Sequence, residues 1–196
     1  MSSHFSSARF SGLVLASFVS LYLGAASAQT RGEPEHFSAS AVDLNTGRAG
    51  PIQISVTRWS TEAERARLQQ TLFKKGQEAL VEELRDMRSV GRIYAPGTIG
   101  YDLRYSEQRA LPDGGREIIL ATDRPMSFRE IVNQPISSQY PFTWVQFTMK
   151  PDGTGEGKLA VRARITGEEA DDLIEVEDFA IHPVRLQSIR SRKGSN

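Results

Sequence analysis

Cysteine and histidine, the side chains most often used for metal binding and nucleophilic chemistry, are scarce in this sequence. There is no cysteine, which excludes disulfides, thiolate metal sites and a cysteine nucleophile. Downstream of the N-terminal apolar segment the histidines are His36 and His182, one near each end. Neither belongs to an H-x-x-x-H or H-E-x-x-H spacing, and a zinc site needs three or four ligands. We therefore predict no metal site and interpret His182, which precedes Pro183, as a turn residue.

Other motifs of catalysis or cofactor binding are also missing. No G-x-S-x-G elbow marks a nucleophilic serine. The paired carboxylates of residues 168–172 fall in a predicted loop, which is a poor support for preorganised acid–base chemistry. Two glycine groups do not open a helix after a strand, as a phosphate loop would. They are Gly91, Gly97 and Gly100, and Gly153, Gly155 and Gly157. The sequence therefore predicts no catalytic, cofactor-binding or metal-binding residue, and no cofactor.

Charged residues on predicted strands allow two interpretations. Asp102 and Arg104 lie on the polar side of one strand, and Asp123-Arg124 end the next. Opposite charges meet if these strands pair through the turn at 111–115, and Arg162 and Arg164 could face Glu175 and Glu177 in the same way. The functional interpretation is a polar binding patch. We favour cross-strand ion pairs worth a few tenths of a kcal/mol each, because such pairs are common on antiparallel sheets.

Aromatic residues give a third candidate site, an apolar pocket inside a barrel. Core packing explains them equally well, because barrels of eight strands are often filled by side chains. These residues are Trp59, Tyr101, Tyr105, Phe142, Trp144 and Phe147.

The longest helical pattern spans residues 59–87. Thr61 and Glu64 form a capping box, in which each side chain accepts a hydrogen bond from a free backbone N–H group at the start of a helix. Leucines at three- and four-residue spacing then make one apolar stripe. Gly76 interrupts the pattern, and glycine costs ~1 kcal/mol relative to alanine inside a helix. We predict a kink or break there, giving two helices of about three turns each.

Strand-like segments surround this helical stretch. Alternation of apolar and polar residues predicts about eight strands, near 36–44, 52–56, 99–106, 117–123, 142–150, 158–165, 173–181 and 184–189, with a short helix near 127–133. Most are joined by tight turns, which favours antiparallel pairing. The predicted fold class is α+β, an antiparallel barrel or sandwich of about eight strands covered by a helical pair.

The first 28 residues have the pattern of a secretory signal peptide. Arg9 precedes the apolar run 12–26, which ends in Ala26-Ser27-Ala28. We predict cleavage after Ala28, a disordered leader at 29–36, one domain at 37–190 and a polar tail at 191–196. Lys+Arg and Asp+Glu both number 24 in the full chain, and loss of Arg9 leaves 23 against 24. This balance argues against nucleic-acid binding and against membrane-surface attraction.

Several stretches together carry a family resemblance. DLNTGRAGP, RWST, GYDLRY and LATDRP resemble an uncharacterised family of exported bacterial proteins with no assigned activity. The resemblance covers roughly residues 37–186. It implies a secreted, single-domain protein and no mechanism.

Two functions remain open from the sequence. The favoured one is an exported, non-enzymatic domain, secreted or periplasmic, that binds a small apolar ligand or a protein partner. The alternative is a hydrolase or isomerase that uses carboxylates and arginines inside the barrel. A filled core favours surface interaction, whereas a buried carboxyl group with a strongly raised pKa in a cleft favours the enzyme.

Overall fold

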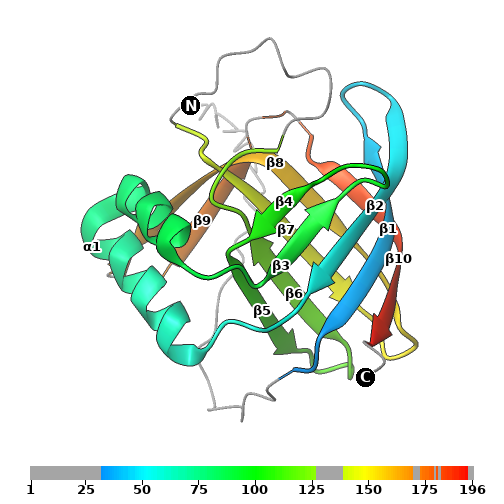
Figure 1. The fold of residues 1–196 in the computed structure, drawn as a ribbon, viewed down its shortest axis with the longest axis horizontal. Helices are drawn as coiled ribbons and strands as arrows, with labels where there is room; N and C mark the ends of the chain where they lie inside the picture. The colour runs from blue at the N-terminus through cyan, green and yellow to red at the C-terminus, as the bar shows by residue number, and fades with distance from the viewer. Residues whose placement is uncertain (1–31, 127–138, 170–172, 179, 181, 194–196) are drawn as a thin grey trace, which may run out of the picture.

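The structure is a computed structural model that describes residues 32–126, 139–169, 173–178, 180 and 182–193. A ten-stranded antiparallel sheet curls into a nearly closed barrel, with one helix on its outside (Figure 1). The elements are β1 (Glu35–Asp43), β2 (Arg48–Val56), α1 (Glu62–Asp86), β3 (Gly91–Tyr94), β4 (Tyr101–Leu103), β5 (Tyr105–Ala110), β6 (Arg116–Ala121), β7 (Phe142–Met149), β8 (Thr154–Glu168), β9 (Leu173–Asp178) and β10 (Val184–Lys193).

Strands follow the order β4-β3-β2-β1-β10-β8-β7-β6-β5, and β9 pairs with the C-terminal half of β8. The two ends of this order are consecutive in sequence. Arg104 separates β4 from β5, and its backbone N–H donates to the carbonyl of Ala121 in β6 (2.9 Å). One bent segment, residues 101–110, therefore pairs with β3 through its first half and with β6 through its second. This segment brings the two ends of the sheet together.

The predicted antiparallel barrel-like sheet is confirmed, but details of the strand prediction are wrong. Strand β3 was not predicted, because four residues are too few to show alternation. The predicted strand 99–106 is divided between β4 and β5. The predicted helix near 127–133 lies outside the described residues.

Both ends of the domain extend further than predicted. β1 begins at Glu35, inside the predicted leader, and β10 runs to Lys193, inside the predicted tail. Glu35 is the register partner of Lys193, so the ends of the two strands pair with each other. The polar residues near the C-terminus are the outward-facing positions of a strand, and this is why the sequence resembles a tail.

Side chains fill the inside of the barrel. Phe37 and Phe147 meet edge to face with ring centroids 5.0 Å apart. Gly157 faces this pair, and a Cβ atom added there would lie 2.3 Å from the Cβ atom of Phe147. The glycine thus makes room for a large neighbour. The buried interior cluster includes Ile54, Val56, Ile93, Leu103, Ile118, Leu120, Val145, Met149, Leu159, Leu186 and Ile189.

Helix α1 packs on the outer face of the barrel wall. Leu72, Leu80 and Leu84 share a second buried cluster with Ala163 and Ile165 of β8. The predicted capping box is present, with Thr61 accepting from the N–H of Glu64. Gly76 has non-helical dihedral angles (φ 81°, ψ −175°), so the predicted interruption is confirmed there. The hydroxyl of Thr71 bonds to Glu83, which links the two sides of the break.

Candidate functional site

The six aromatic residues, for which the sequence left a pocket and core packing equally open, do not meet in one place. Phe147 lies in the interior cluster, and Trp59 and Tyr101 pack partly against it. Phe142, Tyr105 and Trp144 lie outside the wall, in the cluster beneath α1. The six residues are therefore divided between two cores, and both are packed by other side chains.

A buried ion pair lies at the end of the barrel where β1 begins. Glu35 is 3 % exposed and accepts hydrogen bonds from Arg116, one of them at 2.8 Å. Arg116 also donates to Gln108 (2.8 Å) and lies over the ring of Phe37, 5.9 Å from its centroid. Ser191 bonds to the same carboxylate. The strand ends are thus tied together by a polar cluster in which the carboxylate is fully engaged.

The second buried carboxylate is Glu107, on the outer face of β5 beneath α1. It accepts from Arg65 (3.1 Å), from the Tyr105 hydroxyl (2.6 Å) and twice from Arg109 (2.8 and 3.1 Å). Burial acts to raise the pKa of Glu107, but the hydrogen bonds of Arg109 and Tyr105 and the charges of both arginines outweigh it and lower the pKa. Burial, followed by the charge of Glu107, raises the pKa of Tyr105 well above its usual value.

The residue types of this cluster are those of an active site, but its carboxylate is not free to bind a substrate. Four donors occupy the two carboxylate oxygens of Glu107, so little acceptor capacity remains for a substrate proton. Arg65 comes from α1 and the other three residues from β5. The arrangement joins the helix to the barrel wall, and we interpret it as structural.

The predicted cross-strand ion pairs are partly confirmed. Arg104 approaches Asp123 (3.3 Å), and Arg164 approaches Glu177 (3.8 Å). Asp102 instead pairs with Arg92 of β3 (2.9 Å), because β4 lies beside β3.

The predicted pairing of Arg162 with the β9 glutamates is wrong. Glu175 lies opposite Thr166, and β9 pairs with β8 only from residue 163 onward. Arg162 therefore precedes the paired segment, and its side chain is buried.

The two histidines lie on the surface at separate places. His36 is exposed on β1, opposite Arg192 of β10. His182 is also exposed, and its backbone N–H and C=O exchange hydrogen bonds with the side chain of Asn45 (3.3 and 2.8 Å). No group of three or more metal-ligating side chains occurs among the described residues.

Asp178, at the end of β9, is the described carboxyl group with a raised pKa. Burial is the main cause and the charge of Asp43 adds to it, while the N–H of Ala180 and the charge of Lys158 act in the opposite direction. The side chain is only half-buried, and it lines neither of the surface hollows described next. Asp178 therefore does not meet the condition for an acid catalyst in a cleft.

Two adjoining hollows open on the outer face of the barrel, over β6, β7, β8 and β10. The larger has a volume of about 490 Å³ and the smaller about 320 Å³. Glu156 and Gln187 line both, so together they form one groove, which we call the β8–β10 groove. Its other polar lining residues are Glu117, Gln146, Thr148, Lys150, Thr154, Lys158, Arg185 and Ser188.

A β-bulge in β10 shapes this groove. Leu186 lies opposite Gly157 and Ile189 opposite Gly155, so two residues of β10 face one residue of β8. Ser188, in the bulge, is the described non-glycine residue with a positive φ (52°). Such a bulge bends the strand and redirects its side chains, and bulges are frequent next to binding sites.

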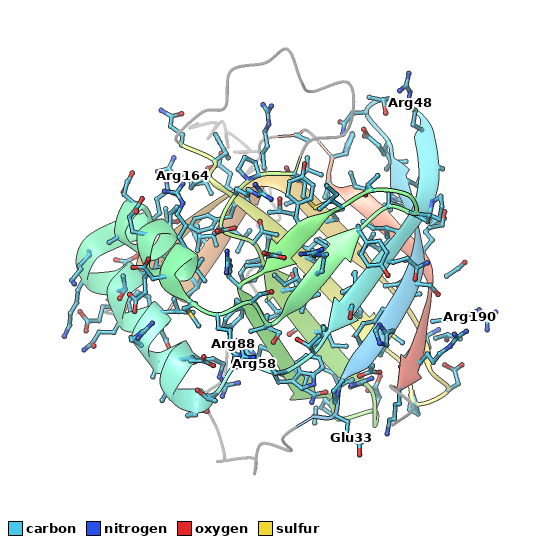
Figure 2. All side chains as sticks on the ribbon, viewed as in Figure 1. Glu33, Arg48, Arg58, Arg88, Arg164 and Arg190 are labelled. Atoms are coloured by element: carbon cyan, nitrogen blue, oxygen red, sulfur yellow. The ribbon has the colours of Figure 1, made fainter. Side chains whose placement is uncertain are left out.

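Lys158 and Arg185 line the groove, and two further cations lie on β10 outside its lining. Lys158 and Arg185 are register partners on neighbouring strands, and Arg190 and Arg192 follow on β10. All four are exposed, and no described carboxylate lies within ion-pair distance of any of them. Figure 2 shows Arg190 on the outside of β10. We call Lys158, Arg185, Arg190 and Arg192 the cation row.

Sequence reasoning missed this surface for an identifiable reason. Lys158 begins the strand predicted near 158–165, but residues 191–196 are predicted to form a polar tail. The pairing of β8 with β10, which brings the cations together, joins segments that are distant in sequence. The alternating basic residues at 190 and 192 were the available signal.

Comparison of the chain with known protein families, with curated proteins and with solved structures finds no match. No helix among the described residues is both long and apolar enough to cross a membrane.

Proposed function

We propose that the protein is an exported, non-enzymatic binding domain that recognises an acidic segment of a protein partner in the β8–β10 groove. The observation that carries this proposal is the cation row beside an open groove. Neighbouring like charges on a surface repel one another, although water and salt screen this repulsion. A partner that supplies carboxylates relieves this repulsion and gains both attraction and faster association.

The groove fits a peptide chain better than a polyanion. The ring of Phe147 points into the barrel, so it offers no surface on which a base could stack. Gln187 presents an amide that can both donate to and accept from a peptide backbone, and Gln146, whose NH2 group already donates to Glu117 (2.6 Å), keeps its amide oxygen as an acceptor.

The packed barrel interior favours surface recognition over the alternative of an apolar ligand. A ligand site of the usual kind is a cavity of ≈ 300–1,000 Å³ lined by apolar groups. Here the inward positions are occupied by large side chains that contact one another. An enzyme built on the buried carboxylates has equally little support, because Glu35 and Glu107 are both occupied by arginines.

A direct test measures binding of model peptides by fluorescence anisotropy. The probe is a labelled decapeptide of alternating Glu and Thr, with its Lys–Thr counterpart and an oligo(dT) decamer as comparisons. We expect the acidic peptide to bind at low salt and to weaken as salt screens the charges. The double variant K158Q/R185Q should bind it about ten-fold more weakly, because two contributions of about 0.5–1 kcal/mol each are lost.

The matched control is R67Q/R85Q, which removes two exposed positive charges from α1. Their net charge change equals that of K158Q/R185Q, but Arg67 and Arg85 already pair with Glu83 and Glu82. The control should bind the peptide as the parent does. Equal losses in both variants would show a general charge effect and contradict the proposal. Tighter binding of oligo(dT) than of the peptide would contradict the assignment to a protein partner.

A further inference from the structure

A second charged surface, opposite in sign, lies on the hairpin formed by the C-terminal half of β8 and by β9. Glu168 and Glu175 are exposed there, and no described cation lies within ion-pair distance of either. Glu177 of the same strand is already engaged by Arg164 and by the Tyr140 hydroxyl (3.0 Å). The hairpin thus carries carboxylates without ion-pair partners, and the cation row carries positive charges without ion-pair partners, among the described residues.

The outer edge of β9 is also unoccupied by any described strand. β9 pairs with β8 on one side, and no further pairing involves it within the described segments. Val176 on this strand is 37 % exposed. An open edge of this kind presents unpaired backbone groups and can dock another protein surface.

Within one molecule the two surfaces cannot meet. Lys158 and Glu168 lie on the same strand, and at ~3.3 Å per residue the strand between them measures roughly 30 Å. Figure 1 shows β9 beside α1 on one side of the barrel and β10 on the opposite side. Charges at this separation are screened from each other at physiological salt. Any pairing between the hairpin and the cation row must therefore involve two molecules.

We propose that the occupant of the β8–β10 groove is the β8–β9 hairpin of a second copy of this chain. Glu168 and Glu175 of one copy then pair with Lys158 and Arg185 of the next, and the exposed edge of β9 lies in the groove. This inference rests on the proposed function and names its partner.

The contact is head to tail, because the two surfaces differ and lie on opposite sides. Such heterologous contacts form rings when the rotation closes and open chains when it does not. Each copy then has one used groove and one used hairpin, except at the ends of an open chain. Because the contact is built on exposed charges, we expect it to be salt-sensitive and of modest affinity.

Analytical ultracentrifugation of the purified protein at several concentrations tests the proposal. At 50 mM salt the weight-average mass should rise with concentration beyond that of a dimer, and at 500 mM salt it should return to the monomer mass. The groove variant K158Q/R185Q and the hairpin variant E168Q/E175Q should each remain monomeric. An equimolar mixture of the two should form a 1:1 dimer and nothing larger, because it contains one intact groove and one intact hairpin.

Two results would overturn the inference. One is a parent protein that stays monomeric at low salt up to about 1 mM. The other is a mixture in which the two variants do not associate although the parent does, since this would place the contact elsewhere.

The acidic decapeptide separates this failure from failure of the proposed function. Its binding to E168Q/E175Q, which keeps the groove intact, reports on the groove alone. Peptide binding without self-association would retain the groove as a binding site and reject only the second copy as its occupant. If the peptide fails to bind and the parent stays monomeric, both proposals are rejected.

Discussion

Arginine side chains behave differently on two sides of the barrel. On the α1 side several of them meet carboxylates: Arg58 pairs with Glu64 (2.9 Å), and Arg65 and Arg109 converge on Glu107. On the β10 side, Arg185, Arg190 and Arg192 have no carboxylate within ion-pair distance in the described chain.

The charges on the α1 side stabilise the fold, whereas those on the β10 side have no ion-pair partner within the described chain. Glu107 is nearly buried, and it lies between the helix and the wall, where removing one partner leaves an uncompensated charge. The cations of the β10 side lie in solvent and contribute little to folding. The same residue type therefore has a structural role on one side and, in the function we propose, an interaction role on the other.

The largest expected effect concerns the inside of the wall that carries the groove. Phe147 is fully buried, whereas Gln146, its neighbour on β7, lines the groove on the other face. Phe147→Ala should lower the free energy of unfolding by about 3–5 kcal/mol through lost burial and the cavity left behind. Gln146→Ala should change it by less than about 0.5 kcal/mol. Urea denaturation measures both, and a small effect of Phe147→Ala would contradict a packed interior.

The second-largest expected effect concerns Glu107, on the α1 side of the barrel. Glu107→Gln removes the charge that Arg65 and Arg109 share, and we expect a loss of about 2–4 kcal/mol in unfolding free energy at pH 7. The control is Glu156→Gln in the groove, which should be nearly neutral. If both substitutions cost the same, the distinction between structural and available charges fails.

The stabilisation by Glu107 should depend on pH in a defined direction. The folded state lowers the pKa of Glu107, so its contribution is fully present above the unfolded pKa, near 4.3 for Glu. It is lost as pH falls through the lower folded pKa. The stability difference between the parent and Glu107→Gln should therefore be constant from pH 8 to about 5 and shrink in more acidic solution. A difference that grows on acidification would contradict the assigned cause.

The smallest expected effect concerns the cation row. K158Q/R185Q should leave the unfolding free energy unchanged or raise it by a few tenths of a kcal/mol, because repulsion between neighbouring cations is removed. R67Q/R85Q, which breaks ion pairs on α1, should lower it slightly. Thermal unfolding at 20 mM and 300 mM salt measures both. A marked loss of stability in K158Q/R185Q would show that these cations have partners within the fold.

The features that could be predicted from the sequence are those that depend on local residue patterns. The capping box at Thr61 and Glu64, the break at Gly76 and the β1–β2 hairpin are all local patterns, and the structure contains them. The same reasoning missed β3, which is short, and grouped together six aromatic residues that the structure divides between the inner and outer faces of the wall.

The candidate site could not be predicted, because it depends on strand neighbours. Lys158 and Arg185 come together only through the β8–β10 ladder, and the bulge at Ser188 shapes the groove between them. No local rule specifies which distant strand pairs with which, or where one residue is inserted into a ladder.

The central claim, that acidic protein segments bind the outer face of β8 and β10, is most directly tested by amide chemical-shift mapping. The acidic decapeptide is titrated into the ¹⁵N-labelled E168Q/E175Q variant, so that self-association does not compete. The account predicts shift changes that cluster at Lys158, Arg185, Gln187 and Ser188 and that vanish at high salt. Shift changes confined to α1 or to the interior cluster around Phe147 would contradict it.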